Sequence, residues 1–187
     1  MVRLQQLLKA ANDCGIRHAA IVDTSDIRFH KDYRKACEKN ACGKYNSNWM
    51  GPPAIGPIRE LERDVLRFKR GLLLETVHRL DRSFDFKGMR AAAGVHQSIF
   101  RKFLDEIRRI YPAEVLLPLD AGCCSYCEKC AYQDREPCRY PDQAVSSVEA
   151  YGMDVGHIMK KAGLPYNHGK GTVCFVGLIL FDAAEYS

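Results

Sequence analysis

Five of the nine cysteines fall within one short segment of the chain. They are Cys123, Cys124, Cys127, Cys130 and Cys138, and the last four follow the pattern C-x2-C-x2-C-x7-C. Three thiols separated by two residues each, with a fourth close by, can surround one compact inorganic centre, and local sequence holds iron–sulfur clusters in this way. The pattern predicts a [4Fe–4S] cluster held by Cys124, Cys127, Cys130 and Cys138.

Two alternatives stay open at this site. A tetrahedral zinc ion is usually bound by two close pairs of ligands with a longer span between them, so the run of three thiols argues against zinc. Alternatively, Cys138 is not a ligand and one iron is left free for a substrate. In classical two-cluster ferredoxins the fourth cysteine follows after three residues and precedes a proline. Here the gap is seven residues and Arg139 follows, which favours a single local cluster.

Three functional hypotheses follow from the cysteine pattern. The leading one is a redox protein that transfers electrons or assists an anaerobic redox enzyme, with a partner protein or a small molecule as its redox partner. In the second, the chain is itself an enzyme, whose cluster keeps an open iron for a small substrate beside the early part of the chain. The third is a structural zinc module for protein interaction.

Outside the main run, Cys123 and an early pair, Cys37 and Cys42, need separate interpretation. Cys123 is adjacent to Cys124, so the two side chains point in different directions, and a small buried residue or a reserve thiol is the simplest reading. Cys37 and Cys42 are separated by four residues. Two thiols at this spacing are nonspecific, so free cysteines and metal ligands both remain open.

Two cysteine-containing blocks and a later stretch form a recognisable pattern. The early block has Cys37, Cys42-Gly43-Lys44, Trp49 and Pro52-Pro53; the late block has Ala121-Gly122, Cys124, Cys127, Cys130 and Cys138-Arg139; the later stretch has Glu149–Val155 and Lys161–Pro165. This pattern resembles a prokaryotic family of predicted metal-binding proteins, domain of unknown function twenty-two eighty-four, and the resemblance covers most of the chain. It implies metal binding and no known reaction.

The chain departs from that family pattern at Gly51. The resemblance implies a cysteine just before the two prolines, which would give the early block a third thiol, but glycine stands there. If the early cysteines of the family hold a second metal centre, this chain supplies only Cys37 and Cys42 from that block. A substitute ligand, namely Cys123, Cys14, Cys174 or a histidine, would then have to complete the site.

The composition is that of an ordinary globular protein. We expect residues 1–187 to form a single metal-binding domain. At this length about 70% of the unfolded surface is buried on folding, so no disulfide is needed to hold a core. The net charge of +5 arises from 28 basic and 23 acidic residues. These are mostly interleaved and form no one-sided basic stripe, which argues against nucleic-acid binding.

Cysteine usage and hydropathy predict a cytoplasmic protein. The N-terminal segment lacks the continuous apolar stretch of a secretory signal. The longest apolar run, Val173–Phe181, has nine residues, far fewer than the about 20 that a membrane-spanning helix needs. An odd number of cysteines without an export signal indicates a reducing compartment, where clustered thiols bind metals or take part in catalysis.

Hydrophobic periodicity predicts the elements that position the cysteines. We expect helices before Gly15, over 58–68, around 99–107 and after an Asp154 cap. Strands are expected over 17–22, 72–80, 115–119 and 172–181. We also expect a long functional segment over 23–57 and a helical turn capped by Ser146 or Ser147. This order predicts an α+β fold, a two-layer α/β sandwich of about four strands, with the cysteine-rich metal loop directly after a strand. The six histidines show no tight ligand spacing and are interpreted as structural or exposed.

Overall fold

The computed structural model describes residues 2–82, 84–111 and 115–182. Within them the chain forms a five-stranded sheet in the order β1-β2-β5-β3-β4. The strands are β1 (His18–Asp23), β2 (Arg70–Arg79), β3 (Leu116–Asp120), β4 (Ser146–Ser147) and β5 (Thr172–Phe181). Neighbouring strands are antiparallel except β3 and β4, which are parallel. The predicted α+β class is therefore confirmed, with five strands rather than about four.

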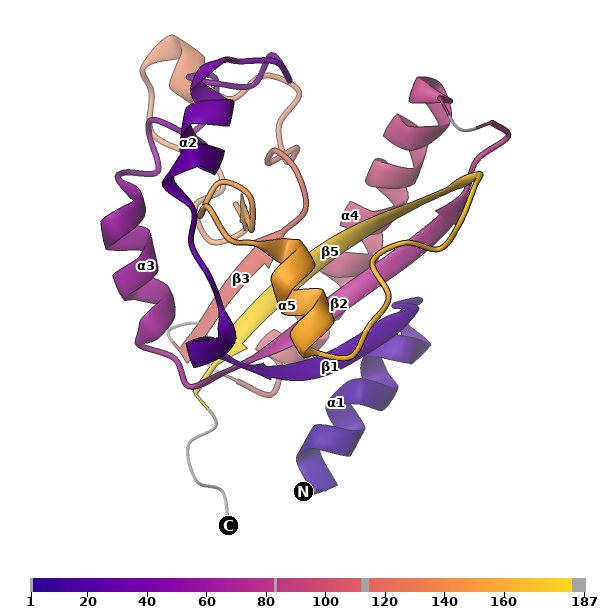
Figure 1. The fold of residues 1–187 in the computed structure, drawn as a ribbon. Helices are drawn as coiled ribbons and strands as arrows, with labels where there is room; N and C mark the ends of the chain where they lie inside the picture. The colour runs from indigo at the N-terminus through magenta and orange to yellow at the C-terminus, as the bar shows by residue number, and fades with distance from the viewer. Residues whose placement is uncertain (1, 83, 112–114, 183–187) are drawn as a thin grey trace.

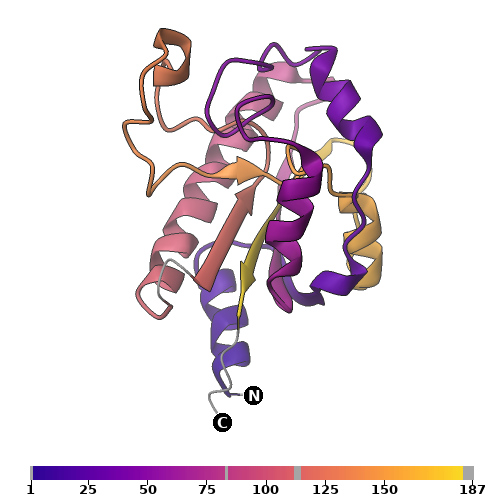
Figure 2. The ribbon, with the colours of Figure 1, turned by 90° about the vertical axis from the view of Figure 1, so that its left-hand side faces the viewer.

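Helices cover both faces of this sheet (Figures 1 and 2). Helices α1 (Val2–Asp13) and α4 (Phe86–Arg108) pack on one face, whereas α3 (Ile58–Leu66) and α5 (Val155–Lys161) pack on the other. The central strands are buried on both sides: Leu72, Leu73 and Leu74 of β2 are successive residues with at most 1% exposure. Such continuous apolar runs are typical of strands that are covered on both faces. The structure thus has three layers where the sequence predicted two.

Two short elements differ from the prediction. Ser146 and Ser147 form β4, not a helical turn, although Ser147 Oγ does accept a hydrogen bond from the Ala150 amide at 3.1 Å. The long segment after β1 contains an additional helix, α2 (Lys31–Glu38). No residue of α2 is buried, so it lacks the apolar stripe by which helices are recognised in sequence. In contrast, Asp154 caps α5 as predicted and accepts the His157 amide at 2.9 Å.

Two segments that are far apart in sequence lie beyond the carboxyl end of β3. One is the cysteine-rich loop after Asp120, which includes the short helix η3 (Ala131–Asp134). The other is the segment between α2 and α3 (Figures 1 and 2). The predicted placement of the cysteine loop directly after a strand is therefore correct. Within the described ranges, none of the helices combines the length and apolar character needed to cross a lipid bilayer.

Candidate metal centre

The cysteine loop leaves the sheet through a sharply turned segment that is tied to the fold at both ends. Asp120, the last residue of β3, accepts a hydrogen bond from the Ala121 amide at 2.8 Å and lies 2.9 Å from the buried His96 of α4. Gly122 follows with a φ of 73°, a conformation that glycine adopts without steric cost. Helix α4 also holds the start of the loop, because Gln97 Nε2 donates to the Cys123 carbonyl at 3.2 Å.

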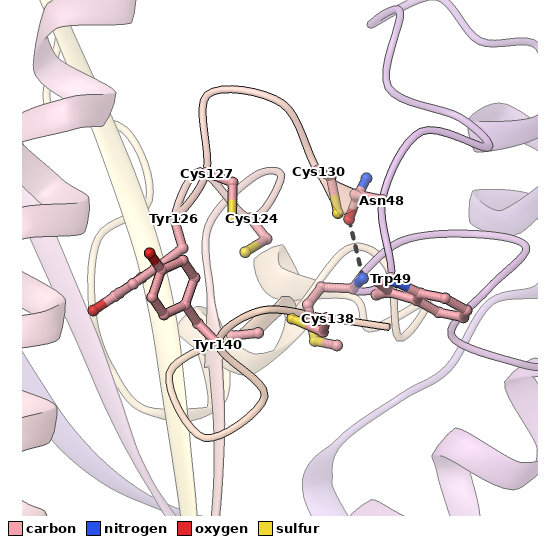
Figure 3. Close-up of a pocket in the computed structure, with 10 residues that line it drawn as sticks. Asn48, Trp49, Cys124, Tyr126, Cys127, Cys130, Cys138 and Tyr140 are labelled. Atoms are coloured by element: carbon pink, nitrogen blue, oxygen red, sulfur yellow. Dashed lines mark hydrogen bonds between the residues drawn. The ribbon is translucent and has the colours of Figure 1, made fainter. Parts of the chain in front are cut away.

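The four predicted ligands line one pocket (Figure 3). Cys124, Cys127, Cys130 and Cys138 are all partly buried and free of disulfides. The other lining residues are Asn48, Trp49, Met50, Tyr126, Tyr140 and Ala144. The loop therefore curls back so that its last cysteine faces the same space as the first three.

Contacts within the loop close it around this pocket. Arg135 ends η3 with a φ of 60°, in the left-handed region, and turns the chain back. Arg139, directly after Cys138, donates to the Lys129 carbonyl at 3.1 Å. This bond joins the residue after the fourth cysteine to the residue before the third. It thereby holds Cys130 and Cys138 near each other across a gap of seven residues.

The early segment forms the opposite wall of the pocket. Trp49 Nε1 donates to the Glu136 carbonyl at 2.9 Å, and its ring contacts Tyr132 edge-on with centroids 4.9 Å apart. Tyr132 in turn donates to Asn46 at 2.6 Å. Asn48 lies in the pocket wall and accepts the Met50 amide at 3.1 Å (Figure 3). The sequence drew attention to Trp49 but offered no signal for Asn48 and Met50, since neither has a distinctive spacing.

No three sulfurs of this pocket lie close enough together to share a single ion. All nine cysteines lie in the described part of the chain, and no three of them bring their sulfurs within 4.8 Å of one another. In a tetrahedral zinc site with Zn–S bonds of about 2.3 Å, the sulfurs lie roughly 3.8 Å apart. A multinuclear cluster separates its thiolates further, because each sulfur binds a different iron.

The structure also brings together Cys37, Cys42 and Cys123, the cysteines of the suggested second site. They line one cavity of about 200 Å³ between the early segment and the cysteine loop. Its other walls include Lys44, Tyr45, Gly51 and Glu149. Gly51, where the family resemblance implies a further cysteine, therefore faces the same space as the three thiols.

Burial raises the pKa of the Cys123 thiol; Lys44 opposes this shift, whereas the nearby Cys124 and Cys42 add to it. Burial likewise raises the pKa of Cys37, and Arg34 opposes that shift. Without a cation in the cavity these thiols are therefore protonated at neutral pH. Metal binding there would have to release their protons.

The two remaining cysteines lie elsewhere. Cys14 packs beside the apolar cluster between α1 and α4. Cys174 lies on β5, where burial and the negative charge of Glu75 raise its pKa to about 11. Neither lines the cysteine pocket or the neighbouring cavity. Of the substitutes considered for the early site, only Cys123 is thus placed to serve.

Comparisons with known proteins agree with a metal-binding role. A family model described as "Predicted metal-binding protein (DUF2284)" matches residues 20–181, which include all the cysteines discussed above except Cys14. No curated protein and no solved structure matches the chain.

Proposed function

The chain belongs to the family of predicted metal-binding proteins whose model matches residues 20–181, and from that premise we propose that it is an iron–sulfur redox protein. Cys124, Cys127, Cys130 and Cys138 would hold one [4Fe–4S] cluster, and the protein would act in the reducing cytoplasm. The observation that carries the proposal is one pocket lined by all four thiols. A cluster of this kind supplies one-electron transfer.

The spacing of the sulfurs supports a cluster over the zinc alternative. A zinc-binding interaction module requires at least three ligands close enough to share one ion. Among the described cysteines, no three bring their sulfurs within 4.8 Å of one another. Four soft thiolates that approach one pocket from greater separations are suited to a centre with several metal atoms.

The position of the pocket supports exchange of electrons with a partner protein. Tyr126 and Tyr140 line it, and their rings lie 4.8 Å apart on its outer side. They are 37% and 46% exposed, so the pocket wall is also part of the protein surface. Arg101 lies 5.0 Å from the centre of the Tyr126 ring and adds positive charge beside it. We expect a redox partner to dock on this side with a complementary acidic surface.

The neighbouring cavity favours a second candidate, an enzyme that acts on a small substrate. The cavity of about 200 Å³ shares Asn48 and Met50 with the cysteine pocket. Lys44 and Glu149 supply one positive and one negative group in its wall, which could orient a small polar molecule. In this hypothesis Cys138 is not a ligand, and the cluster would polarise the substrate at an open iron.

Elemental analysis tests the proposed centre directly. Protein purified without oxygen is expected to contain about four irons and four acid-labile sulfides per chain, as a cubane requires, and to be brown. Stoichiometric zinc in a colourless protein without sulfide would instead establish the interaction module. Purification must exclude air, because oxidation of the thiolates and their cluster would remove the metal.

Trp49 is expected to protect the cluster from oxidation. Trp49→Phe keeps an aromatic wall but loses the hydrogen bond to the Glu136 carbonyl, worth about 1 kcal/mol. If opening of the pocket wall becomes easier by that free energy, the cluster should be lost in air about fivefold faster. The measurement is the decay of visible absorption after exposure to air. Phe84→Leu, at an exposed aromatic outside the pocket, is the control, and equal decay of both variants would contradict the protective role.

A further inference from the structure

Three side chains away from the cysteine pocket converge on one point. Glu75 of β2 lies between two histidines: its Oε2 is 2.7 Å from His18 Nδ1, and its Oε1 is 3.0 Å from His168 Nε2. One ligand atom from each of the three residues lies within 4.8 Å of the other two. This grouping is close to the arrangement of ligand atoms around one metal ion, whose bonds to nitrogen and oxygen are about 2.0–2.2 Å long.

The fold creates this convergence through strand pairing and one loop. His18 of β1 is directly opposite Glu75 in the antiparallel register, so both side chains point to the same face of the sheet. The segment between α5 and β5 carries His168 back to these strands (Figure 1). The two imidazole rings stack with centroids 5.4 Å apart and planes 10° from parallel.

The burial of Glu75 favours a cation at this point. Its side chain has no exposed surface, and an isolated buried carboxylate is strongly unfavourable unless it is paired. In the part of the chain that the structure describes, its ion-pair partners are His18 and His168, and no lysine or arginine pairs with it. The side chains of His18 and His168 are 29% and 16% exposed, so an ion can reach the site from solvent.

We propose that His18, Glu75 and His168 bind one divalent first-row transition-metal ion, in a site separate from the cysteine pocket. Two imidazoles and one carboxylate suit zinc or ferrous iron. Magnesium and calcium prefer sites made mainly of oxygen, and here only one carboxylate contributes. Three protein ligands leave at least one coordination position open, as in catalytic rather than structural sites. This inference goes beyond the proposed redox function and does not depend on it.

Zinc uptake by the intact protein tests the site. Protein purified without oxygen, with its own cysteine-bound metal, is dialysed to equilibrium against Zn²⁺, and bound zinc is counted by elemental analysis. His168→Ala is expected to bind one zinc fewer per chain than the parent and to weaken that binding by about 100-fold or more, since even the loss of an outer partner can cost 10- to 100-fold. His157→Ala, on α5 and outside the group, is the matched control and should bind as the parent does.

Two further variants keep the test decisive. Glu75→Gln preserves shape and removes the charge, and His18→Gln removes a ligand at the other side; both should also lose one zinc. Thermal unfolding with and without Zn²⁺ checks that each variant is folded, and only the parent and His157→Ala should gain stability from the ion. Equal zinc uptake by the parent and His168→Ala would overturn the proposal and leave a purely structural hydrogen-bonded network.

Discussion

Replacing Cys130 by serine is expected to remove the cluster, with iron and sulfide falling from about four of each per chain to less than about one. Cys130 is the third thiol of the closely spaced run, and its neighbour Lys129 receives the bond from Arg139 that closes the loop. A hydroxyl is a much poorer ligand than a thiolate for an iron–sulfur centre. Iron and sulfide analysis and the visible spectrum measure the loss, and Cys130→Ala excludes residual binding by the serine oxygen.

Cys14→Ser is the matched control for this experiment. Cys14 is also a partly buried free thiol, but it lies beside the cluster of apolar residues between α1 and α4. The control should keep its full iron content. If Cys130→Ala retained the parent's iron and sulfide while remaining folded, the assignment of the ligands would be wrong.

The equivalent change at Cys138 separates the two functional candidates. If four thiolates hold the cluster, Cys138→Ser should lose most of its iron, as Cys130→Ser does. If Cys138 is not a ligand and one iron is open, the variant should keep about four irons. Retention of iron together with a spectrum that responds to small polar molecules would favour the enzyme.

Introducing a thiol at Gly51 is expected to create a complete second centre. Gly51 lines the cavity that already contains Cys37, Cys42 and Cys123, so Gly51→Cys would provide a fourth sulfur. After reconstitution with iron and sulfide, the variant should contain about four more irons per chain than the parent. The same analysis on Gly51→Ser, which adds similar bulk without a soft ligand, is the control.

The backbone at Gly51 can accept this side chain. The residue is not among those with a positive φ. A β-carbon there would approach Asn48 Nδ2 to 3.0 Å and Oδ1 to 3.2 Å, so the amide must shift by a few tenths of an ångström. The contacts of Nδ2, to the Lys44 carbonyl and to Ser47 Oγ, are both long at 3.4 Å and therefore weak. We expect a modest loss of stability at most.

A double variant shows whether the added iron occupies this cavity. Adding Cys37→Ser to Gly51→Cys should cancel the gain, because it returns the cavity to three thiols. If Gly51→Cys bound no more iron than Gly51→Ser, the three cysteines would be free thiols, as their spacing in sequence also allowed.

Much of the fold could be predicted from local patterns. The strand predicted over 172–181 has the same ends as β5, and Asp154 marked the start of α5. These features depend on residues that are close together in the chain, because apolar periodicity, capping residues and turn residues determine where an element begins and ends. Helix α2 and the two-residue β4 escaped prediction, because neither has an apolar period of its own.

The sequence by itself determined the ligand set proposed for the cysteine cluster, because four thiols within fifteen residues must lie near one another in any compact loop. Only the tertiary structure decided which distant residues join them. Cys123 meets Cys37 and Cys42 because the early segment packs against the cysteine loop. His18, Glu75 and His168 meet because β1 pairs with β2 in one particular register and the chain returns over them 93 residues after Glu75. The physical reason is the range of the interactions: local spacing limits what a short loop can surround, whereas contacts between remote segments depend on how the whole core packs.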